Sequence, residues 1–188
     1  MTATTDTKLR WTGADLELFP ENDKRYEIID GDLYVTHAPH WKHQDAINNL
    51  GTYLTLWSKK HQQGKVLQTP GLICANDDNV IPDLIWISRA KLATSVDESG
   101  HFITAPELIV EVLSQTAKDI ARDRQVKLKL YSRVGVKEYW IVDWQEQMVE
   151  IYRRQEAFLQ LAYTLFVEDE LTSPLFPEFS IKVAEIFQ

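Results

Sequence analysis

Residues 108–113, Leu-Ile-Val-Glu-Val-Leu, decide the fold that this sequence predicts. A run so short and so apolar is typical of a strand that is covered on both faces, as at the centre of a sheet flanked by helices. Side chains alternate along a strand, so Ile109, Glu111 and Leu113 share one face and the even-numbered residues share the other. An acid, Glu111, is therefore predicted to point into a covered face.

The segments on either side of this strand change repeatedly between strand and helix patterns. Asp30-Gly31 has the composition of a tight hairpin turn within residues 26–35. The patterns further predict strands at 65–69, 139–142, 148–152 and 158–166, a second hairpin or bulged pair at 72–75 and 80–87, and helices at 41–60, 116–133 and 183–187. This order predicts an α/β (α+β) fold with one mixed sheet flanked by helices.

The chain has 188 residues, of which 44% are hydrophobic and 26% are charged. This composition fits a single globular domain over residues 1–188, with residues 1–15 as a loosely ordered lead-in. The one cysteine, Cys74, excludes an internal disulfide framework and is expected to be a packed thiol. There is no run of about 18 apolar residues and no apolar N-terminal core, so we expect no membrane partner and a cytoplasmic location.

A second acid, Asp83, follows Pro82 at the start of the apolar segment 84–87. Burying an ionised carboxylate is costly unless it has a cation, a hydrogen-bond shell or a proton. Taken singly, Asp83 could be an exposed acid at a strand edge, and Glu111 could be half of a structural ion pair. Taken together, two acids from neighbouring strands suit Mg²⁺, which accepts one or two carboxylates along with water and substrate phosphate.

A lysine and a third acid join this pair. Lys127 shares the helix face of Ile120 and Tyr131, which is the face predicted to pack on the sheet. Its ammonium could orient an attacking water and offset phosphate charge, or its stem could pack while the ammonium reaches water. Glu27 lies in the first predicted hairpin, and the residue pattern alone favours a solvated surface position for it.

Three histidines, His37, His40 and His43, have a spacing that could suggest zinc. Pro39 breaks the run, so only His40 and His43 can share a helix face, and no cysteine lies nearby. Structural zinc sites usually take four nitrogen or sulfur ligands. Zinc is therefore not the favoured metal, and His43 is expected at the start of a helix close to the site.

These residues belong to a longer series of motifs. Pro82-Asp83, Glu111-Val112-Leu113 and Lys127 resemble a variant of the PD-(D/E)-x-K nuclease pattern, in which the lysine has moved from the strand to the following helix. The wider series consists of Tyr26-Glu27-Ile28-Ile29-Asp30-Gly31, His43, Pro82-Asp83-Leu84, residues 105–114, Asp123-Arg124-x-x-Lys127-x-x-x-Tyr131, and residues 135–143. Over about residues 16–185, this series resembles the Uma-two family of restriction endonuclease-like proteins.

The resemblance implies a restriction endonuclease-like core: a mixed sheet flanked by helices, often in homodimers. It also implies that Asp83 and Glu111 are ligands of a divalent metal and that Lys127 is the catalytic lysine. Glu27 falls on the family's N-terminal acidic position, which makes it a candidate outer ligand of the metal or its water.

The leading hypothesis is metal-dependent hydrolysis of phosphodiester bonds in nucleic acid, with DNA as the expected substrate. Asp83, Glu111 and the carbonyl of Val112 would hold Mg²⁺ or Mn²⁺, and Lys127 would steady the nucleophile. His43 and Arg124 would contact substrate. Two alternatives stay open: a nuclease fold that only binds nucleic acid or a protein, and a dimeric scaffold whose carboxylates make buried ion pairs.

The net charge of −8 limits how strongly such a protein can bind phosphate. Seven of the 20 basic residues, however, lie between Lys118 and Lys137, with only two acids among them. That stretch contains the predicted helix of Lys127. The acidity therefore argues against strong, indiscriminate DNA binding rather than against a phosphate-containing substrate.

Overall fold

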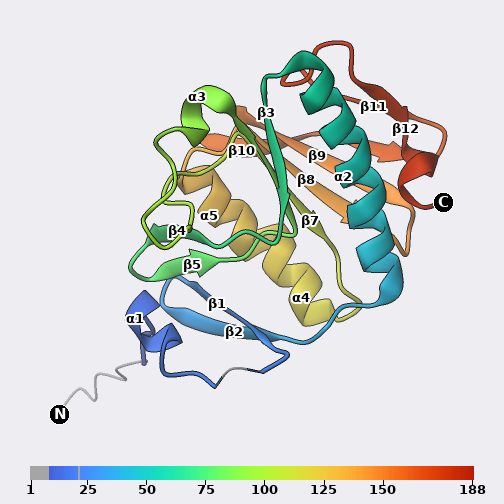
Figure 1. Cartoon of the computed structure of the whole chain (residues 1–188). Coiled ribbons are helices and arrows are strands. Elements are labelled where there is room, and N and C mark those ends of the chain that lie inside the picture. The colour runs from blue at the N-terminus through green and yellow to red at the C-terminus, as the bar shows by residue number, and fades with distance from the viewer. Residues whose placement is uncertain (1–8, 21) are drawn as a thin grey trace.

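The computed structural model describes residues 9–20 and 22–188 of the chain (Figure 1). The elements are, in chain order, α1 (Gly13–Leu16), β1 (Arg25–Ile29), β2 (Asp32–Thr36), α2 (Trp41–His61), β3 (Gly64–Gln68), β4 (Leu72–Ala75), β5 (Asp78–Val80), β6 (Leu84–Ser88), α3 (Arg89–Leu92), β7 (Leu108–Val112), α4 (Ala117–Ala121), η1 (Arg122–Lys127), α5 (Leu128–Arg133), β8 (Glu138–Asp143), β9 (Met148–Gln155), β10 (Phe158–Phe166), β11 (Glu170–Thr172), β12 (Ser180–Lys182) and η2 (Val183–Ile186).

The largest sheet has six strands in the order β10-β9-β8-β7-β6-β3. Its neighbouring pairs are antiparallel except for β7 and β8, which are parallel and are joined by the helical segment α4–η1–α5. A parallel pair needs such a crossover, because the chain must return to the same end of the sheet. The predicted mixed sheet flanked by helices is confirmed, and residues 108–113 supply one of its inner strands.

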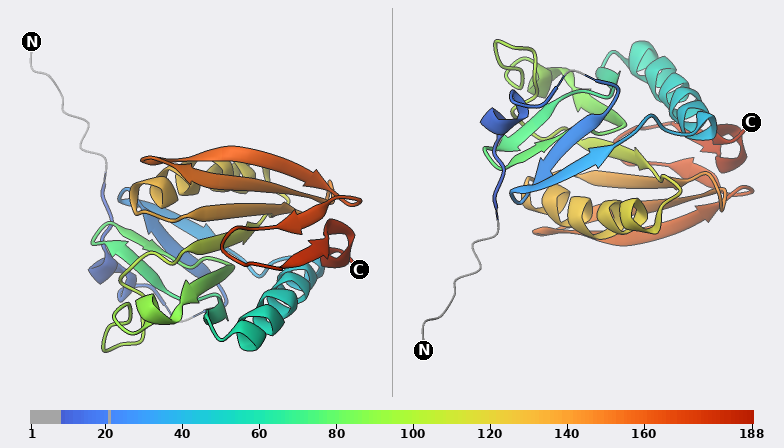
Figure 2. Two further views of the ribbon diagram at one scale, coloured as in Figure 1. Left: turned by 90° about the horizontal axis from the view of Figure 1, so that it is seen from above. Right: turned by 90° about the horizontal axis from the view of Figure 1, so that it is seen from below.

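Two hydrophobic cores lie on opposite faces of this sheet. The even-numbered residues of β7 pack with α2 and with the C-terminal segment, which lies beside α2 in both views of Figure 2. Ile109 and Leu113 pack instead with residues of α5 and of a second, smaller sheet. The predicted alternation is therefore confirmed, and Glu111 belongs to the α5 side. Cys74 packs against this second core as a free thiol, where burial raises its pKa to about 12.

The N-terminal hairpin belongs to a separate four-stranded sheet in the order β2-β1-β5-β4. The prediction of one sheet for the whole domain is therefore wrong. The predicted strand 80–87 divides at Pro82 into β5 and β6, which belong to different sheets. Proline has no N–H to donate to a strand ladder, so it favours a break at this point. The break places Asp83 at the boundary between the two sheets.

The helix predicted over residues 116–133 forms, but its middle turn is wide. The segment η1, Arg122–Lys127, is a π-helix between α4 and α5. A π turn bonds residues five apart and so brings them onto the same side of the helix, and such segments are frequent at functional sites. Arg122 and Lys127 are both buried as a result, although the regular helical period predicts another face for Arg122.

The N-terminal segment is attached to the smaller sheet. The backbone N–H of Trp11 donates to the carbonyl of Gly31 at 2.8 Å, and α1 follows directly. The expected loose lead-in over residues 1–15 is therefore wrong from Trp11 onward, and residues 1–8 lie outside the described part of the chain.

The C-terminal segment forms a small sheet of its own. Strands β11 and β12 have three residues each, which is too few for an alternating pattern to reveal them in the sequence. The predicted helix 183–187 is a 3-10 turn, η2. None of the helices in the described ranges is long and apolar enough to cross a membrane.

Candidate active site

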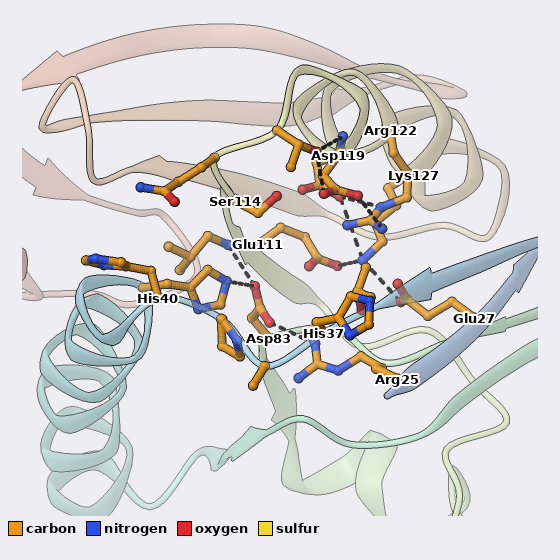
Figure 3. A pocket seen from close by; sticks show the side chains of 18 of the residues that line it. Arg25, Glu27, His37, His40, Asp83, Glu111, Ser114, Asp119, Arg122 and Lys127 are labelled. Carbon is orange, nitrogen blue, oxygen red and sulfur yellow. Dashed lines mark hydrogen bonds and ion pairs between the residues drawn. The ribbon is translucent and has the colours of Figure 1, made fainter. Parts of the chain in front are cut away.

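A cavity of about 260 Å³ lies where the two larger sheets meet η1. Residues of β1, β7, η1 and the start of α2 line it, together with the turn before β6 (Figure 3). Glu27, Asp83, Glu111 and Lys127, all proposed from the sequence, lie together in it, and none is more than 3% exposed. The structure thus brings the predicted acids and the predicted lysine into one buried, charged site.

The register of β6 against β7 explains why the two strand acids meet. Leu84 pairs with Val110 in an antiparallel ladder, so the same register places Asp83, one residue earlier, opposite Glu111. The backbone N–H of Val112 donates to Oδ2 of Asp83 at 3.0 Å. Val112 also lines the cavity, as expected for a candidate ligand.

Two cationic or polar partners hold the Asp83 carboxylate. Nη1 of Arg25 lies 3.0 Å from Oδ1, and Nε2 of His43 lies 3.2 Å from Oδ2. Burial by itself would raise the pKa of Asp83, but the hydrogen bond from His43 and the charges of His43, Lys127 and Arg25 outweigh it. The pKa of Asp83 therefore lies below its usual range, and the carboxylate is ionised at neutral pH.

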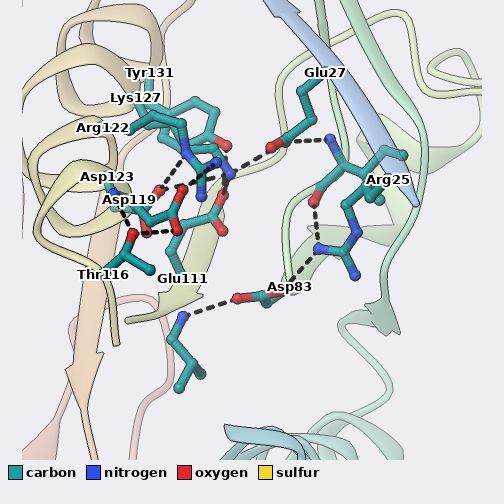
Figure 4. Close-up of polar contacts among 12 residues, drawn as sticks. Arg25, Glu27, Asp83, Glu111, Thr116, Asp119, Arg122, Asp123, Lys127 and Tyr131 are labelled. Atoms are coloured by element: carbon teal, nitrogen blue, oxygen red, sulfur yellow. Dashed lines mark hydrogen bonds and ion pairs between the residues drawn. The ribbon is translucent and has the colours of Figure 1, made fainter. Parts of the chain in front are cut away.

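The ammonium group of Lys127 joins three acids. Its Nζ lies 2.9 Å from Oε1 of Glu111, 3.1 Å from Oε1 of Glu27 and 3.8 Å from Oδ1 of Asp123 (Figure 4). Burial would lower the pKa of Lys127, but the charges of Glu111, Glu27 and Asp123 outweigh burial and raise it above its ordinary value. Lys127 is therefore protonated at neutral pH, and of the two alternatives that the sequence left open, the structure shows the inward ammonium.

Glu111 is the acid whose ionisation is most strongly opposed. Burial raises its pKa to about 8, although the charge of Lys127 acts in the other direction. Oε1 accepts hydrogen bonds from Lys127 and from the hydroxyl of Tyr131, the latter at 2.7 Å. Among the described residues, no hydrogen bond to Oε2 of Glu111 is found. Oε2 is also not among the fully buried atoms that lack a hydrogen-bond partner. Glu111 itself lines the cavity.

Glu27 lies in the interior, which differs from the surface position favoured by the pattern alone. Only 1% of Glu27 is exposed, and its Oε1 accepts a hydrogen bond from the N–H of Ile81 at 2.9 Å. Strand β1 is an inner strand of the smaller sheet, and its residues Glu27, Ile28 and Ile29 are buried. The Lys127 ammonium supplies the partner that a buried carboxylate requires.

Of the two residues expected to contact substrate, His43 lies at the cavity and Arg124 does not. His43 lies in the cavity lining, and its Nδ1 is buried without a hydrogen-bond partner. Arg124 does not line the cavity. Its side chain lies 3.1 Å from Glu150 and 3.5 Å from Asp143, so the structure does not bring it to the site.

A sequence model of the Uma2 (Uma-two) family, described as "Putative restriction endonuclease", matches residues 14–184. The chain belongs to this family. Membership supports a nuclease function for the chain, and the resemblance stated from the motifs is confirmed. No curated protein sequence matches the chain.

Solved structures place this Uma-two protein in a known fold. The crystal structure of a "putative nuclease belonging to DUF820" from Anabaena variabilis superposes with a TM-score of 0.76 and 19% sequence identity, covering 94% of this chain and 97% of that one. This likeness confirms the restriction endonuclease-like core. The type IIG restriction endonuclease BpuSI gives a TM-score of 0.44 at 11% identity, over 81% of this chain and 16% of that protein.

The donor set of the cavity fits a hard divalent cation such as Mg²⁺. Within the described ranges, no three or more His, Cys, Asp or Glu side chains are grouped so that they could hold a metal ion by themselves. The cavity lining does supply two carboxyl groups, those of Asp83 and Glu111, and Mg²⁺ commonly takes one or two carboxylates along with water and phosphate oxygens. A cation bound here would also lower the pKa of Glu111, which burial raises.

Three further residues of this Uma-two site were not among the predicted functional residues. Arg25 contacts Asp83, and Asp123 lies between Arg122 and Lys127, with Arg122 Nε 3.2 Å from Oδ1 of Asp123. Asp123 does belong to the quoted Asp-Arg-x-x-Lys motif, so its four-residue spacing from Lys127 was an available signal. Arg25 carries no such signal, because it contacts a residue 58 positions away.

Proposed function

We propose that this protein is a nuclease that hydrolyses phosphodiester bonds of DNA with the help of Mg²⁺ or Mn²⁺. One observation carries the proposal: two carboxylates on neighbouring strands and a protonated lysine meet in one buried cavity. Family membership supports the same reaction class. Asp83, Glu111 and the carbonyl of Val112 are the proposed metal ligands. Glu27 is the proposed outer ligand of the metal or its water. A bound ion would act as a Lewis acid at the phosphate and lower the pKa of water.

The protein's own groups have distinct roles in this proposal. Because the pKa of Lys127 is raised, its ammonium does not act as a base; it positions the attacking water and stabilises negative charge that develops at the phosphate. Arg25 and His43 keep Asp83 ionised, and a metal ion bound at Oδ1 would displace Arg25 from that oxygen or share it. Asp123 and Glu27 fix the position of the Lys127 ammonium.

A plasmid-nicking assay tests the proposal. With Mg²⁺, wild type should convert negatively supercoiled plasmid DNA, in which some segments are unpaired, to the open circle. Asp83→Asn, Glu111→Gln and Lys127→Met should each lose about a hundredfold in rate, as expected when a group that stabilises transition-state charge is removed. Lys129→Met is the matched control, because Lys129 lies in the same helical segment with its side chain 75% exposed. Equal rates in all five proteins would contradict the assignment.

A structural role for the carboxylates is the competing function, and one observation favours it. In the structure, Asp83 is paired with Arg25, Glu111 with Lys127 and Asp123 with Arg122. A scaffold held by these pairs should melt at the same temperature with and without Mg²⁺. The nuclease should instead gain stability as Mg²⁺ rises above its dissociation constant, and Asp83→Asn should remove that gain.

The predicted homodimer remains part of this proposal. Equilibrium sedimentation of the wild-type chain, with and without DNA, would test it. A monomer in both conditions would contradict the dimer without affecting the assignment of the metal ligands.

A further inference from the structure

An exposed group of aromatic and cationic side chains stands at the start of α2. Trp41, the first residue of α2, is 65% exposed. The rings of His40 and Trp144 stack with centroids 4.9 Å apart and planes 4° apart. Nζ of Lys42 lies 5.8 Å from the Trp41 ring and 5.7 Å from the Trp144 ring. We refer to His40, Trp41, Lys42 and Trp144 as the aromatic cluster.

This aromatic cluster is continuous with the candidate active site. His40 and Trp144 line the cavity that holds Asp83 and Glu111. In Figure 3, His40 lies at the rim on the side opposite Glu27. Trp144 also lines a small hollow of about 40 Å³, together with Trp41 and Lys42. A polynucleotide with one phosphate in the cavity could therefore place an adjacent nucleotide over the cluster.

We propose that the aromatic cluster is a stacking platform for the bases of an unpaired DNA strand, next to the bond that is cut. The proposal rests on the proposed nuclease function and specifies its substrate. Stacking on aromatic rings tolerates any base, because every base has a π-face. Lys42 supplies positive charge beside the two rings, and the phosphate backbone of DNA requires such a charge. One acid, Asp45, also lines the hollow.

The geometry of the cavity favours an unpaired strand over a duplex. The acids and the lysine are at most 3% exposed, so a phosphate must enter a concave site to reach them. A single strand can bend its backbone inward, whereas the bases of a duplex stack on one another and are not available to Trp41. A net charge of −8 further disfavours binding that relies on backbone charge alone.

Fluorescence anisotropy of labelled DNA tests the proposal without cleavage, in buffer that contains EDTA. The probes are a fluorescein-labelled oligothymidylate of about 12 nucleotides, within the usual range of single-strand sites, and its duplex with oligodeoxyadenylate. Wild type should bind the single strand about tenfold more tightly than the duplex. Trp41→Ala should weaken single-strand binding about tenfold, and Trp41→Tyr should restore most of it, because tyrosine keeps a stacking ring.

The matched control is Phe158→Ala. Phe158 is also 65% exposed and aromatic, but it lies on the edge strand β10 and does not line the cavity. Its replacement should leave binding unchanged. Equal affinity of wild type for the two probes would overturn the platform, and so would equal affinity of wild type and Trp41→Ala for the single strand. The platform would also be overturned if Trp41→Ala changed only the oligomeric state.

Failure of the platform and failure of the nuclease function are distinguishable. Nicking of duplex plasmid by wild type, combined with no effect of Trp41→Ala on binding or rate, would keep the nuclease and remove the platform. Single-strand binding that depends on Trp41, combined with no hydrolysis under Mg²⁺ or Mn²⁺, would keep the platform and remove the nuclease.

Discussion

The ammonium of Lys127 donates a hydrogen bond of 2.9 Å to the carboxyl group of Glu111, and the two side chains are only 2% and 3% exposed. The lysine comes from a π-helical turn and the acid from an inner strand. An ammonium buried so deeply is expensive to desolvate, and it persists because Glu27 and Asp123 are further acidic partners. Such an arrangement is weak evidence that the pair stabilises the fold. It is stronger evidence for a functional site, where buried charged groups are common.

Removing the lysine should destabilise the protein. Lys127→Met leaves Glu27, Glu111 and Asp123 without their shared cation, so we expect a loss of about 3 kcal/mol in the free energy of unfolding, as is typical when one partner of a buried pair is removed. Urea denaturation measures the change. Lys129→Met should stay within about 0.5 kcal/mol of wild type. The double variant Lys127→Met/Glu111→Gln should recover part of the loss, and no recovery would argue against direct coupling of the two residues.

Glu111 should make stability depend on pH in a defined direction. Its pKa is about 8 in the folded chain and close to 4.3 when unfolded. Between these values the folded state holds one more proton than the unfolded state, so this group makes the free energy of unfolding fall as pH rises from about 5 to 8. In EDTA, Glu111→Gln should show a shallower decline than wild type over that range. Parallel curves for the two proteins would contradict the raised pKa.

Asp83 should act in the opposite sense and at lower pH. Its folded pKa lies below the ordinary value, so its contribution to stability is present above pH 4 and is lost as pH falls further. Asp83→Asn should therefore be less sensitive to acid than wild type below about pH 4. Circular dichroism during acid titration measures this difference, and an identical acid transition in both proteins would contradict it.

Arg25 should compete with a metal ion for Asp83. Its guanidinium lies 3.0 Å from Oδ1 of Asp83, so a cation bound to that oxygen must displace it or share it. Titration of Mn²⁺ by calorimetry should show about tenfold tighter binding to Arg25→Ala than to wild type, equivalent to about 1.4 kcal/mol. Arg153→Ala is the matched control, because Arg153 pairs with a buried acid outside the cavity, Glu138. Weaker binding to Arg25→Ala would show that Arg25 supports the metal site.

The parts of the site that follow from local periodicity could be predicted from the sequence. Alternation within residues 108–113 placed Glu111 on the correct face, and the helical spacing of Lys127 and Tyr131 placed both inside. These patterns depend only on the backbone geometry of one strand or one helix. The expectation that the two acids come from neighbouring strands was also correct, but the register that places Asp83 opposite Glu111 comes from the structure.

The remaining parts depend on contacts between distant segments. Glu27 is buried because β5 and Lys127 cover it, and neither is near it in the sequence. The π turn that rotates Arg122 inward has no composition of its own to reveal it. Arg25 contacts Asp83 from the second sheet, and the sequence patterns did not separate the two sheets.

The metal site itself offers the most direct measurement. Crystals of the wild-type chain soaked in Mn²⁺ should show an anomalous peak between the carboxylates of Asp83 and Glu111, with the Lys127 ammonium within hydrogen-bond reach of a water on the ion. Crystals of Asp83→Asn treated in the same way should lack the peak. A wild-type crystal without a peak there at saturating Mn²⁺, with Arg25 still bound to Asp83, would contradict the account.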